Sequence, residues 1–327
     1  MMRRRDLIAG LGSTALAWPL PALAQAAPAR IGLLFAGADG SLVSSSFIDQ
    51  IRASLRSAGL NEGRDYQFEK RFANGDYARF PTLAAELAQT GVKLVLPNTI
   101  AAVRAAQSLS PPRPIVMVAI NDPVGARLIA SLARPGGHTT GVSTLVEDLT
   151  PKMLEYQRTL VPRAKTLGII ANPANPSNAL MLDGFRTRAA AFGMSVHGVP
   201  LSLPADIDTA FAALAAAKPD VIHLLSDAAN IDLSDRVVAF AKSQRIPVLS
   251  TFPPMVGLGC LLAYGPPFEK LLSRVGYYVK RILEGAEPAE LPVEQPTEIE
   301  LWLNSKTADD LGLAIPDSLL VAANKVI

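Results

Sequence analysis

Cysteine and histidine are scarce in this chain of 327 residues, which has one cysteine, Cys260, and three histidines. A single cysteine forms no intramolecular disulfide bond and builds no thiolate cluster for zinc or for iron and sulfur. It also excludes a two-lobed racemase, which needs a pair of cysteines in its cleft. The histidines, His138, His197 and His223, lack the i, i+4 spacing of a helical metal-binding pair. The sequence therefore predicts no metal site and no cofactor.

The motifs that mark common enzyme classes are absent as well. The sequence contains no Gly-x-Ser-x-Gly turn, no Walker A loop and no Gly-x-Gly-x-x-Gly fingerprint. The acidic pairs Glu147-Asp148 and Asp309-Asp310 fit solvent-exposed faces or helix starts better than catalytic sites. We therefore expect no enzyme, although a two-lobed periplasmic enzyme with another cleft chemistry stays an alternative.

The small excess of positive charge is confined to one end of the chain. The 31 Lys and Arg residues exceed the 29 Asp and Glu residues by two. Arg3, Arg4, Arg5 and Asp6 account for that excess, so the 303 residues after position 24 hold 28 basic and 28 acidic side chains. A balanced chain has no global positive field that recruits nucleic acid or anionic lipid. We expect no nucleic acid as partner.

The N-terminus has the pattern of an export signal. Basic residues 3–5 precede an apolar stretch, residues 7–23, and Ala22-Leu23-Ala24 supplies a small-x-small cleavage pattern. Glycine and proline interrupt the stretch, which disfavours a membrane span. The basic run also fits the twin-arginine pattern, with an ordinary secretory signal as the alternative. No cysteine near the cleavage site can carry a lipid anchor. The sequence predicts a signal peptide, residues 1–24, and a mature protein in the periplasm.

Strand and helix patterns alternate from residue 30 onward. Short apolar runs between turn residues predict strands, and apolar stripes at helical spacing predict helices. In the first half, strands are expected at residues 30–35, 65–72, 92–96 and 114–119, and helices are expected to begin at residues 44–46, 81, 99 and 123, the last ending near residue 133. In the second half, strands 166–171, 194–200, 220–225 and 247–250 alternate with helices 150–160, 177–192, 205–217 and 232–244.

This order predicts an α/β fold with two doubly wound parallel-sheet lobes. Two further extended stretches, residues 259–264 and 297–303, flank a long helix near the C-terminus. If both cross between the lobes, the chain passes between them three times and the lobes share a hinge. The alternative is that residues 260–327 form a separate C-terminal appendage.

Three longer motifs are specific enough to compare with a known family. Residues 122–143 contain Asp-Pro-Val-Gly and Ala-Arg-Pro-Gly-Gly-His-Thr-Thr-Gly-Val-Ser, residues 171–176 read Ala-Asn-Pro-Ala-Asn-Pro, and residues 291–320 contain Leu-Pro-Val-Glu-Gln-Pro-Thr. From Phe47 onward the chain resembles a group of bacterial periplasmic binding proteins. These are the solute-binding components of ABC importers whose founding members are linked to tryptophan or other aromatic amino acids.

The resemblance implies the type I periplasmic-binding fold, in which a three-crossing hinge joins two lobes around a ligand cleft. The N-terminal lobe is then expected at residues 30–143 with 264–296, and the C-terminal lobe at residues 144–263 with 297–327. The implied function is that of a monomeric receptor, which delivers an amino acid or small organic acid to an ABC permease in the inner membrane. A ligand-sensing subunit for a membrane receptor is the alternative.

The identity of the solute is left open by two loops that depart from the family pattern. They are residues 36–46 and residues 226–232, where family members often carry more aromatic side chains. Both loops should face the ligand, so the departure affects the expected ligand and leaves the expected fold unchanged.

Ligand contacts are expected from residues that directly follow the strands. In doubly wound sheets the ligand lies beyond the carboxyl ends of the strands, where helix N-termini present free N–H groups and a positive dipole end. This predicts as ligand-binding residues Ser45, Ser46, Asn98, Thr99, Asn121, Asp122, Asn175, Ser177, Asp227, Asn230 and Tyr264. Asp227 is the carboxylate expected to pair an amino group, and Tyr264 is expected to stack on a ring or donate its hydroxyl.

Several of these residues have a purely structural alternative. Ser46, Thr99 and Ser177 stand where helix N-caps belong. Asn175, which precedes a proline, fits a tight turn as well as it fits a ligand contact. Asp122 also precedes a proline and fits an N-cap.

Overall fold

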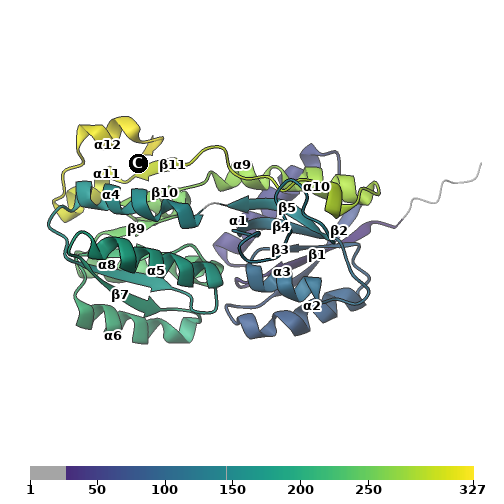
Figure 1. The fold of residues 1–327 in the computed structure, drawn as a ribbon, viewed down its shortest axis with the longest axis horizontal. Helices are drawn as coiled ribbons and strands as arrows, with labels where there is room; N and C mark the ends of the chain where they lie inside the picture. The colour runs from purple at the N-terminus through teal and green to yellow at the C-terminus, as the bar shows by residue number, and fades with distance from the viewer. Residues whose placement is uncertain (1–26, 145) are drawn as a thin grey trace, which may run out of the picture.

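Two mainly parallel sheets, each covered by helices, lie next to each other along the long axis of the molecule (Figure 1). The structure is a computed structural model that describes residues 27–144 and 146–327. The expected signal peptide, residues 1–24, lies outside the described residues. Within the described ranges, no helix is both long enough and apolar enough to cross a bilayer.

The first sheet has five parallel strands in the order β2-β1-β3-β4-β5. They are β1 (Ala29–Phe35), β2 (Tyr66–Phe72), β3 (Leu94–Pro97), β4 (Ile115–Asn121) and β5 (Thr139–Thr144). The helices packed on this sheet are α1 (Leu42–Ser57), α2 (Phe80–Gln89), α3 (Ile100–Gln107), α9 (Phe268–Leu272) and α10 (Val275–Leu283). Helices α2 and α3 share one apolar core with the sheet, and α1 and α10 share another. Because β3 and β4 are covered on both faces, their sequences are continuous apolar runs.

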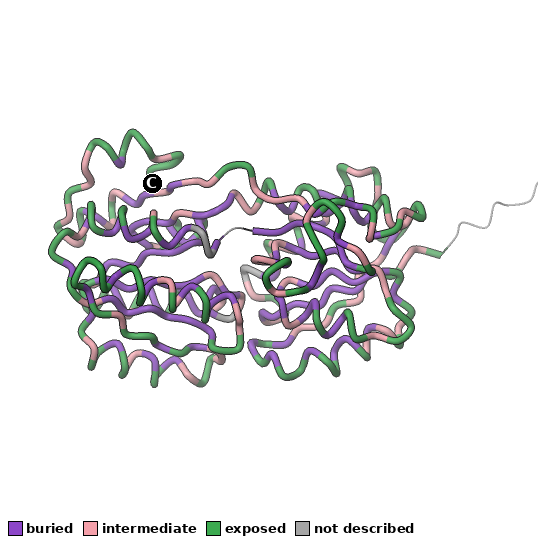
Figure 2. The backbone as a smooth tube through the Cα atoms, viewed as in Figure 1, coloured by how far each residue is buried: buried purple, intermediate pink, exposed green. Residues whose placement is uncertain are grey.

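The second sheet has seven strands in the order β12-β11-β10-β9-β8-β6-β7, and only β11 runs antiparallel to its neighbour β10. The strands are β6 (Thr166–Ala171), β7 (Ser195–Pro200), β8 (Val221–Leu224), β9 (Val248–Ser250), β10 (Leu262–Gly265), β11 (Glu300–Leu303) and β12 (Lys325–Val326). The helices of this half are α4 (Thr150–Leu160), α5 (Pro176–Ala190), α6 (Ile207–Ala217), α7 (Ala228–Asp232), α8 (Ser234–Ser243), α11 (Ser305–Leu311) and α12 (Asp317–Ala322). Figure 2 shows the buried strands inside both halves and the exposed outer faces of the helices.

The chain passes between the two sheets three times. It leaves the first sheet after β5, returns from β10 to α9 and α10, and leaves again before β11 (Figure 1). The first and third passes lie side by side, because Ser143 donates its backbone N–H to the Glu294 carbonyl oxygen at 2.8 Å. This arrangement confirms the predicted fold of two doubly wound sheets with three crossings, and it is not that of a separate C-terminal appendage. The expected lobe boundaries stay a prediction, although Tyr264, expected in the N-terminal lobe, belongs to β10 of the second sheet.

One predicted helix does not form. Residues 123–133 are turns and bends instead of a helix. The Asp122 side chain accepts the backbone N–H of Gly125 at 2.8 Å, which fixes a tight turn directly after β4. Arg127 then adopts a left-handed conformation with φ of 56°, which no α-helix continues. The apolar spacing in this segment comes from Leu128 and Ile129 packing on the first sheet's core as part of a loop.

Two helix starts also differ from the prediction. Helix α1 begins at Leu42, and the hydroxyl of Ser41 caps it by accepting the N–H of Ser44 at 3.1 Å. Ser46 is therefore inside the helix and is not its N-cap. Helix α5 is capped by the side chain of Asn175, with Pro176 as its first residue and Ser177 as its second. Thr99 does cap α3, as predicted, because its side chain accepts the N–H of Ala102.

Candidate functional site

A cleft lies between the two sheets, at the carboxyl ends of their parallel strands. It contains about 830 Å³ of space between protein atoms, counting its open mouth. The lining from the first half includes the ends of β1, β4 and β5, the residues that follow β3, and residues of α1. The lining from the second half includes residues that follow β8 and residues at the start of α5. This is the position at which doubly wound sheets hold their ligands.

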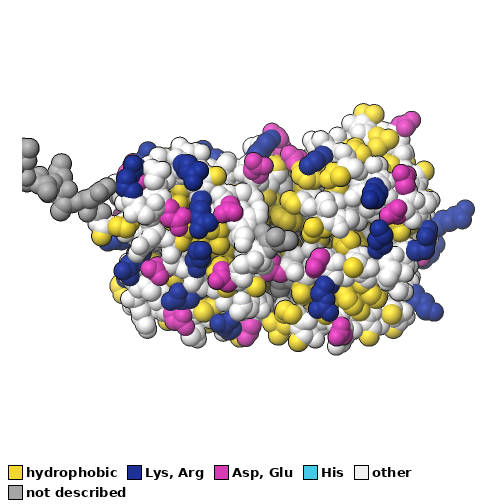
Figure 3. All heavy atoms as spheres, turned by 180° about the vertical axis from the view of Figure 1, so that it is seen from behind, with side chains coloured by type: hydrophobic (Ala, Val, Ile, Leu, Met, Phe, Trp, Pro, Cys, Tyr) yellow, Lys and Arg dark blue, Asp and Glu magenta, His cyan; other side chains and the backbone are white. Residues whose placement is uncertain are grey.

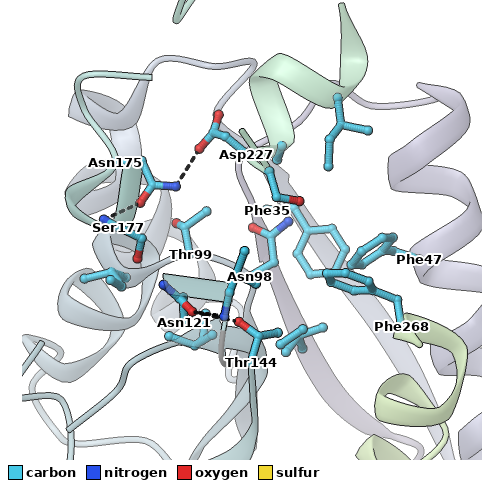
Figure 4. Close-up of a pocket in the computed structure, with 18 of the residues that line it drawn as sticks. Phe35, Phe47, Asn98, Thr99, Asn121, Thr144, Asn175, Ser177, Asp227 and Phe268 are labelled. Carbon is cyan, nitrogen blue, oxygen red and sulfur yellow. Dashed lines mark hydrogen bonds between the residues drawn. The ribbon is translucent and has the colours of Figure 1, made fainter. Parts of the chain in front are cut away.

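Polar side chains occupy one side of the cleft and aromatic rings the other. Figure 4 shows Asn175, Ser177, Thr99 and Asn121 on the polar side, with Phe35, Phe47 and Phe268 gathered opposite them. The rings of Phe47 and Phe268 lie 5.9 Å apart, and both lie near Phe252 of the second half. Such a divided lining suits a ligand that has a polar end and a compact apolar body.

Three helix N-termini bring polar groups to this lining. Thr99 begins α3, Asn175 and Ser177 begin α5, and the buried Ser44 lies in the first turn of α1. Helix N-termini present unpaired N–H groups and the positive end of the helix dipole, which favour an anionic group. The cleft is thus equipped to hold a carboxylate without a basic side chain.

A bulge in β4 turns further groups toward the cleft. The pairing of β4 with β5 shifts between Met117 and Ile120, and Ala119 between them has φ of 56°. A left-handed alanine is uncommon, and such bulges and strained residues occur next to binding sites. After the bulge, the Asn121 side-chain oxygen accepts the Thr144 hydroxyl at 3.1 Å and the Val146 N–H at 3.0 Å. Asn121 therefore fixes the first crossing segment to the cleft floor.

Asp227 is almost fully buried and is already held by donors from both halves. Tyr77, which follows β2, donates its hydroxyl to Asp227 Oδ2 at 2.5 Å. Asn175 donates to the same oxygen at 2.8 Å, and Asn172 donates to Oδ1 at 3.0 Å. Burial and the Asp227 charge raise the pKa of Tyr77 well above its ordinary value, so the phenol stays protonated and donates. The predicted carboxylate thus joins the two halves through protein groups.

A second carboxylate in the lining, Asp232, is not among the predicted ligand-binding residues, although it ends the loop 226–232 that was expected to face the ligand. Its Oδ2 accepts the backbone N–H of Ala38 at 2.9 Å, which is another contact between the halves. Its Oδ1 is buried and has no hydrogen-bond partner among the described residues. Burial raises the pKa of the Asp232 carboxyl, and the Ala38 backbone N–H and the Ser41 side chain partly oppose that shift. The sequence predicted one long helix beginning at residue 232, which would place Asp232 at a helix start. In the structure Asp232 is instead the last residue of the short helix α7, and α8 is a separate helix.

The predicted site residues divide into two groups. Six of them line the cleft, namely Asn98, Thr99, Asn121, Asn175, Ser177 and Asp227. The lining does not include Ser45, Ser46, Asp122, Asn230 and Tyr264. Asn230 belongs to α7 and is fully buried, and Tyr264 packs edge-on against Tyr156 with the ring centroids 5.2 Å apart. Helix α1 instead contributes Ser44, one position before the predicted pair, and Phe47, one position after it.

The two loops that depart from the family pattern face each other across the cleft. Ser44 comes from the first, and Ser226, Asp227 and Asp232 come from the second. Gly37 lies where they meet, since a Cβ atom there would be 2.6 Å from Ser44 Oγ and 2.8 Å from Asp232 Oδ2. The absence of a side chain at position 37 therefore permits this junction.

Metal-binding clusters are not found in the described ranges, where no three His, Cys, Asp or Glu side chains converge. His223 is fully buried in the second half, with Nε2 2.8 Å from the Gln157 side-chain oxygen and its ring against Phe185. Burial lowers the pKa of His223 to about 3, so the ring is neutral. This histidine is part of the core and not of the cleft.

Comparison with known proteins gives one matching family and several similar chains. The family described as ABC transporter substrate binding protein matches residues 44–327. A tyrosine-binding protein from Clostridioides difficile is 26% identical over 260 residues, which are 80% of this chain and 74% of that protein. A Streptococcus pneumoniae ABC domain crystallised with L-Trp is 26% identical with a TM-score of 0.79, covering 91% of this chain and all of the other. A conserved domain protein from Vibrio cholerae is 26% identical with a TM-score of 0.81, covering 91% and 99% of the two chains.

Proposed function

The chain belongs to the family of ABC transporter substrate-binding proteins, and from that premise we propose that it binds an amino acid or a small organic acid in the cleft between its halves. The observation that carries this proposal is the lining itself, in which helix N-termini and amides face aromatic rings. The relatives whose names include L-Trp and tyrosine support the same class of solute. Binding without chemistry is the proposed task, since the family consists of binding proteins.

Closure of the two halves is the proposed mechanism. A ligand that touches both halves binds the closed arrangement more tightly than the open one, and so shifts the population toward closure. The contacts of Tyr77 with Asp227 and of Ala38 with Asp232 belong to the closed arrangement, because each joins one half to the other. The closed form is then the one recognised by an ABC permease in the inner membrane.

The site of action proposed for the mature protein is the periplasm, where it works as a monomer. The expected signal peptide, residues 1–24, supports export, and the balanced charge of the mature chain fits a freely diffusing receptor. Expression of the full chain followed by fractionation, with Arg4-Arg5 changed to Lys-Lys in a second sample, tests both export and the twin-arginine route. Retention of the unchanged chain in the cytoplasm would contradict the proposal.

The decisive experiment is a binding screen of the purified mature chain, residues 25–327. Isothermal titration calorimetry against the common amino acids and small carboxylates should identify at least one ligand with micromolar or tighter affinity. Small-angle scattering with saturating ligand should then show a smaller radius of gyration than scattering without it. Binding with no compaction would overturn the closure mechanism, and an absence of any binding would overturn the proposed solute class.

A further inference from the structure

The charged side chains in the lining of the cleft are of one sign. Asp227 and Asp232 contribute two carboxylates, and the lining contains no lysine, arginine or histidine among the residues that the structure describes. A closed and partly dry cleft strengthens the field of such charges, because little water screens them. The side chains of the lining therefore favour a ligand with a positive charge, whereas the helix N-termini favour a negative one.

The two carboxylates differ in how many hydrogen bonds they already accept from the protein. Asp227 already accepts hydrogen bonds from Tyr77, Asn172 and Asn175. Asp232 accepts one from Ala38 on Oδ2 and has the Ser41 side chain as a further polar neighbour, while no donor in the described part of the chain lies within hydrogen-bond geometry of its buried Oδ1. A buried carboxylate oxygen that has lost water and gained no donor is costly, so a donor that arrives with the ligand relieves that cost. Asp232 is thus the carboxylate with an acceptor still to fill.

Asp232 lies near the aromatic side of the cleft. It contacts the loop directly after β1, since Ala38 donates to it and Gly37 lies against its Oδ2. Phe35, the last residue of β1, is only two positions before Gly37 and lines the cleft beside Phe47 and Phe268. A ligand nitrogen bound at Asp232 would therefore lie close to the side that accepts an apolar body.

We infer that Asp232 binds a protonated amino group of the ligand through its free Oδ1, so that the solute is an amine with a compact apolar body, amino acids included, and not a simple carboxylic acid. The inference rests on the proposed function and narrows its solute class. In an amino acid the carboxylate would then face the N-termini of α3 and α5 on the polar side. Asp227 acts separately, as the group that joins the halves.

Matched ligands and matched variants test the inference. The ligands are L-tryptophan, tryptamine and indole-3-propionate, with L-leucine, isoamylamine and 4-methylpentanoate as an aliphatic set. Each set keeps the apolar body and removes either the carboxylate or the amino group. The variant Asp232→Asn keeps the shape and an acceptor for Ala38 but loses the charge. Asp235→Asn, an exposed acid at the start of α8, is the control.

Titration calorimetry should show that, in the set that binds, the deaminated acid binds at least about 30-fold more weakly than the amino acid, as expected when one member of a buried charge pair is removed. Asp232→Asn should weaken the amino acid and the amine by a similar factor, while Asp235→Asn leaves both unchanged. Circular dichroism melts of the two variants check that the fold is retained.

Three outcomes would overturn the inference. The first is a deaminated acid that binds and compacts the chain as well as the amino acid does, which would leave the proposed function intact. The second is an Asp232→Asn variant that is folded and binds amino acids with unchanged affinity. The third is a chain that binds no member of either set nor any ligand of the wider screen, and only this result would remove the proposed function as well.

Discussion

His223 shows at the scale of one residue how burial fixes a charge state. Its ring is fully buried, contacts Phe185 and has a single hydrogen-bond partner, the Gln157 side chain. Burial lowers its pKa from 6.5 to about 3, because no compensating acid stabilises the protonated ring. In the unfolded chain the same ring takes up a proton near pH 6.5, so the two states bind different numbers of protons in acid.

We predict that the free energy of unfolding falls as the pH drops below 6.5. The folded state keeps His223 neutral down to about pH 3, whereas the unfolded state gains a proton, so stability is lost over this window. The loss due to this one residue should be about 2 kcal/mol at pH 5, from 1.36 kcal/mol for each pH unit below the unfolded pKa. Urea unfolding at pH 7.5 and pH 5 measures it.

The variant His223→Gln keeps a donor for Gln157 and removes the titrating ring. Its unfolding free energy should fall less between pH 7.5 and pH 5 than that of the unchanged chain. His138→Gln, at an exposed histidine, is the matched control. If the unfolding free energy of His223→Gln falls between pH 7.5 and pH 5 by as much as that of the unchanged chain, the buried ring is not the cause of the pH dependence.

At the scale of elements, the close contact of α1 with α10 fixes a returning segment onto the first sheet. Gly276 of α10 lies against Ser54 of α1, and a Cβ atom at position 276 would be 2.2 Å from the Ser54 carbonyl oxygen. The Ser54 hydroxyl donates to the Ser273 carbonyl at 2.6 Å and accepts the Gly276 N–H at 2.8 Å. Ser54 and Gly276 are 222 positions apart along the chain. Because a side chain at position 276 would overlap the α1 backbone, glycine lets the two helices approach this closely.

We predict that Gly276→Ala lowers the free energy of unfolding by about 1–3 kcal/mol, the usual cost of forcing extra volume into a well-packed contact. Thermal unfolding followed by circular dichroism measures the change. Gly257→Ala is the matched control, because a Cβ atom there meets nothing within 4 Å. If Gly276→Ala melts at the same temperature as the control, α10 can move away from α1 without a loss of stability.

At the scale of the whole molecule, the function depends on how the two halves meet. Figure 3 shows basic and acidic side chains mixed over the face seen from behind, and hydrophobic side chains near the junction of the halves. Specific contacts join the two halves. They include the Tyr77–Asp227 hydrogen bond, the Ala38–Asp232 hydrogen bond and the ring contact of Phe47 with Phe252.

We predict that Tyr77→Phe weakens ligand binding by about tenfold. Loss of one hydrogen bond to a charged group costs the closed form about 1.5–3 kcal/mol, and Asp227 keeps its two amide donors. Tyr77 is not part of the cleft lining, so the loss acts through closure. Calorimetry gives the affinity, and scattering should show a larger radius of gyration without ligand.

Tyr277→Phe is the control, because Tyr277 is a 39% exposed tyrosine on α10. If Tyr77→Phe binds and closes as the unchanged chain does, the Tyr77–Asp227 bond does not govern closure.

The sequence by itself determined the layers and their order, because strand and helix periodicity is local. The runs at residues 30–35, 92–96 and 166–171 are confirmed as strands β1, β3 and β6, to within a residue or two. The predicted ligand-binding residues were chosen because they follow strands, and six of the eleven line the cleft. This choice succeeds because the carboxyl ends of parallel strands all lie at one edge of a sheet.

The tertiary structure decided what those side chains do. Asp227 contacts Tyr77, 150 positions away, and Asp232 contacts Ala38, 194 positions away. No local pattern encodes such pairs, because they depend on how two separately folded sheets approach each other. Residues 123–133 also show the effect of tertiary contacts. Their apolar side chains are spaced as in a helix, but they pack on the first sheet's core from a loop, because the Asp122 side chain fixes a tight turn. Local periodicity thus set the framework, and long-range contacts assigned the carboxylates of the cleft.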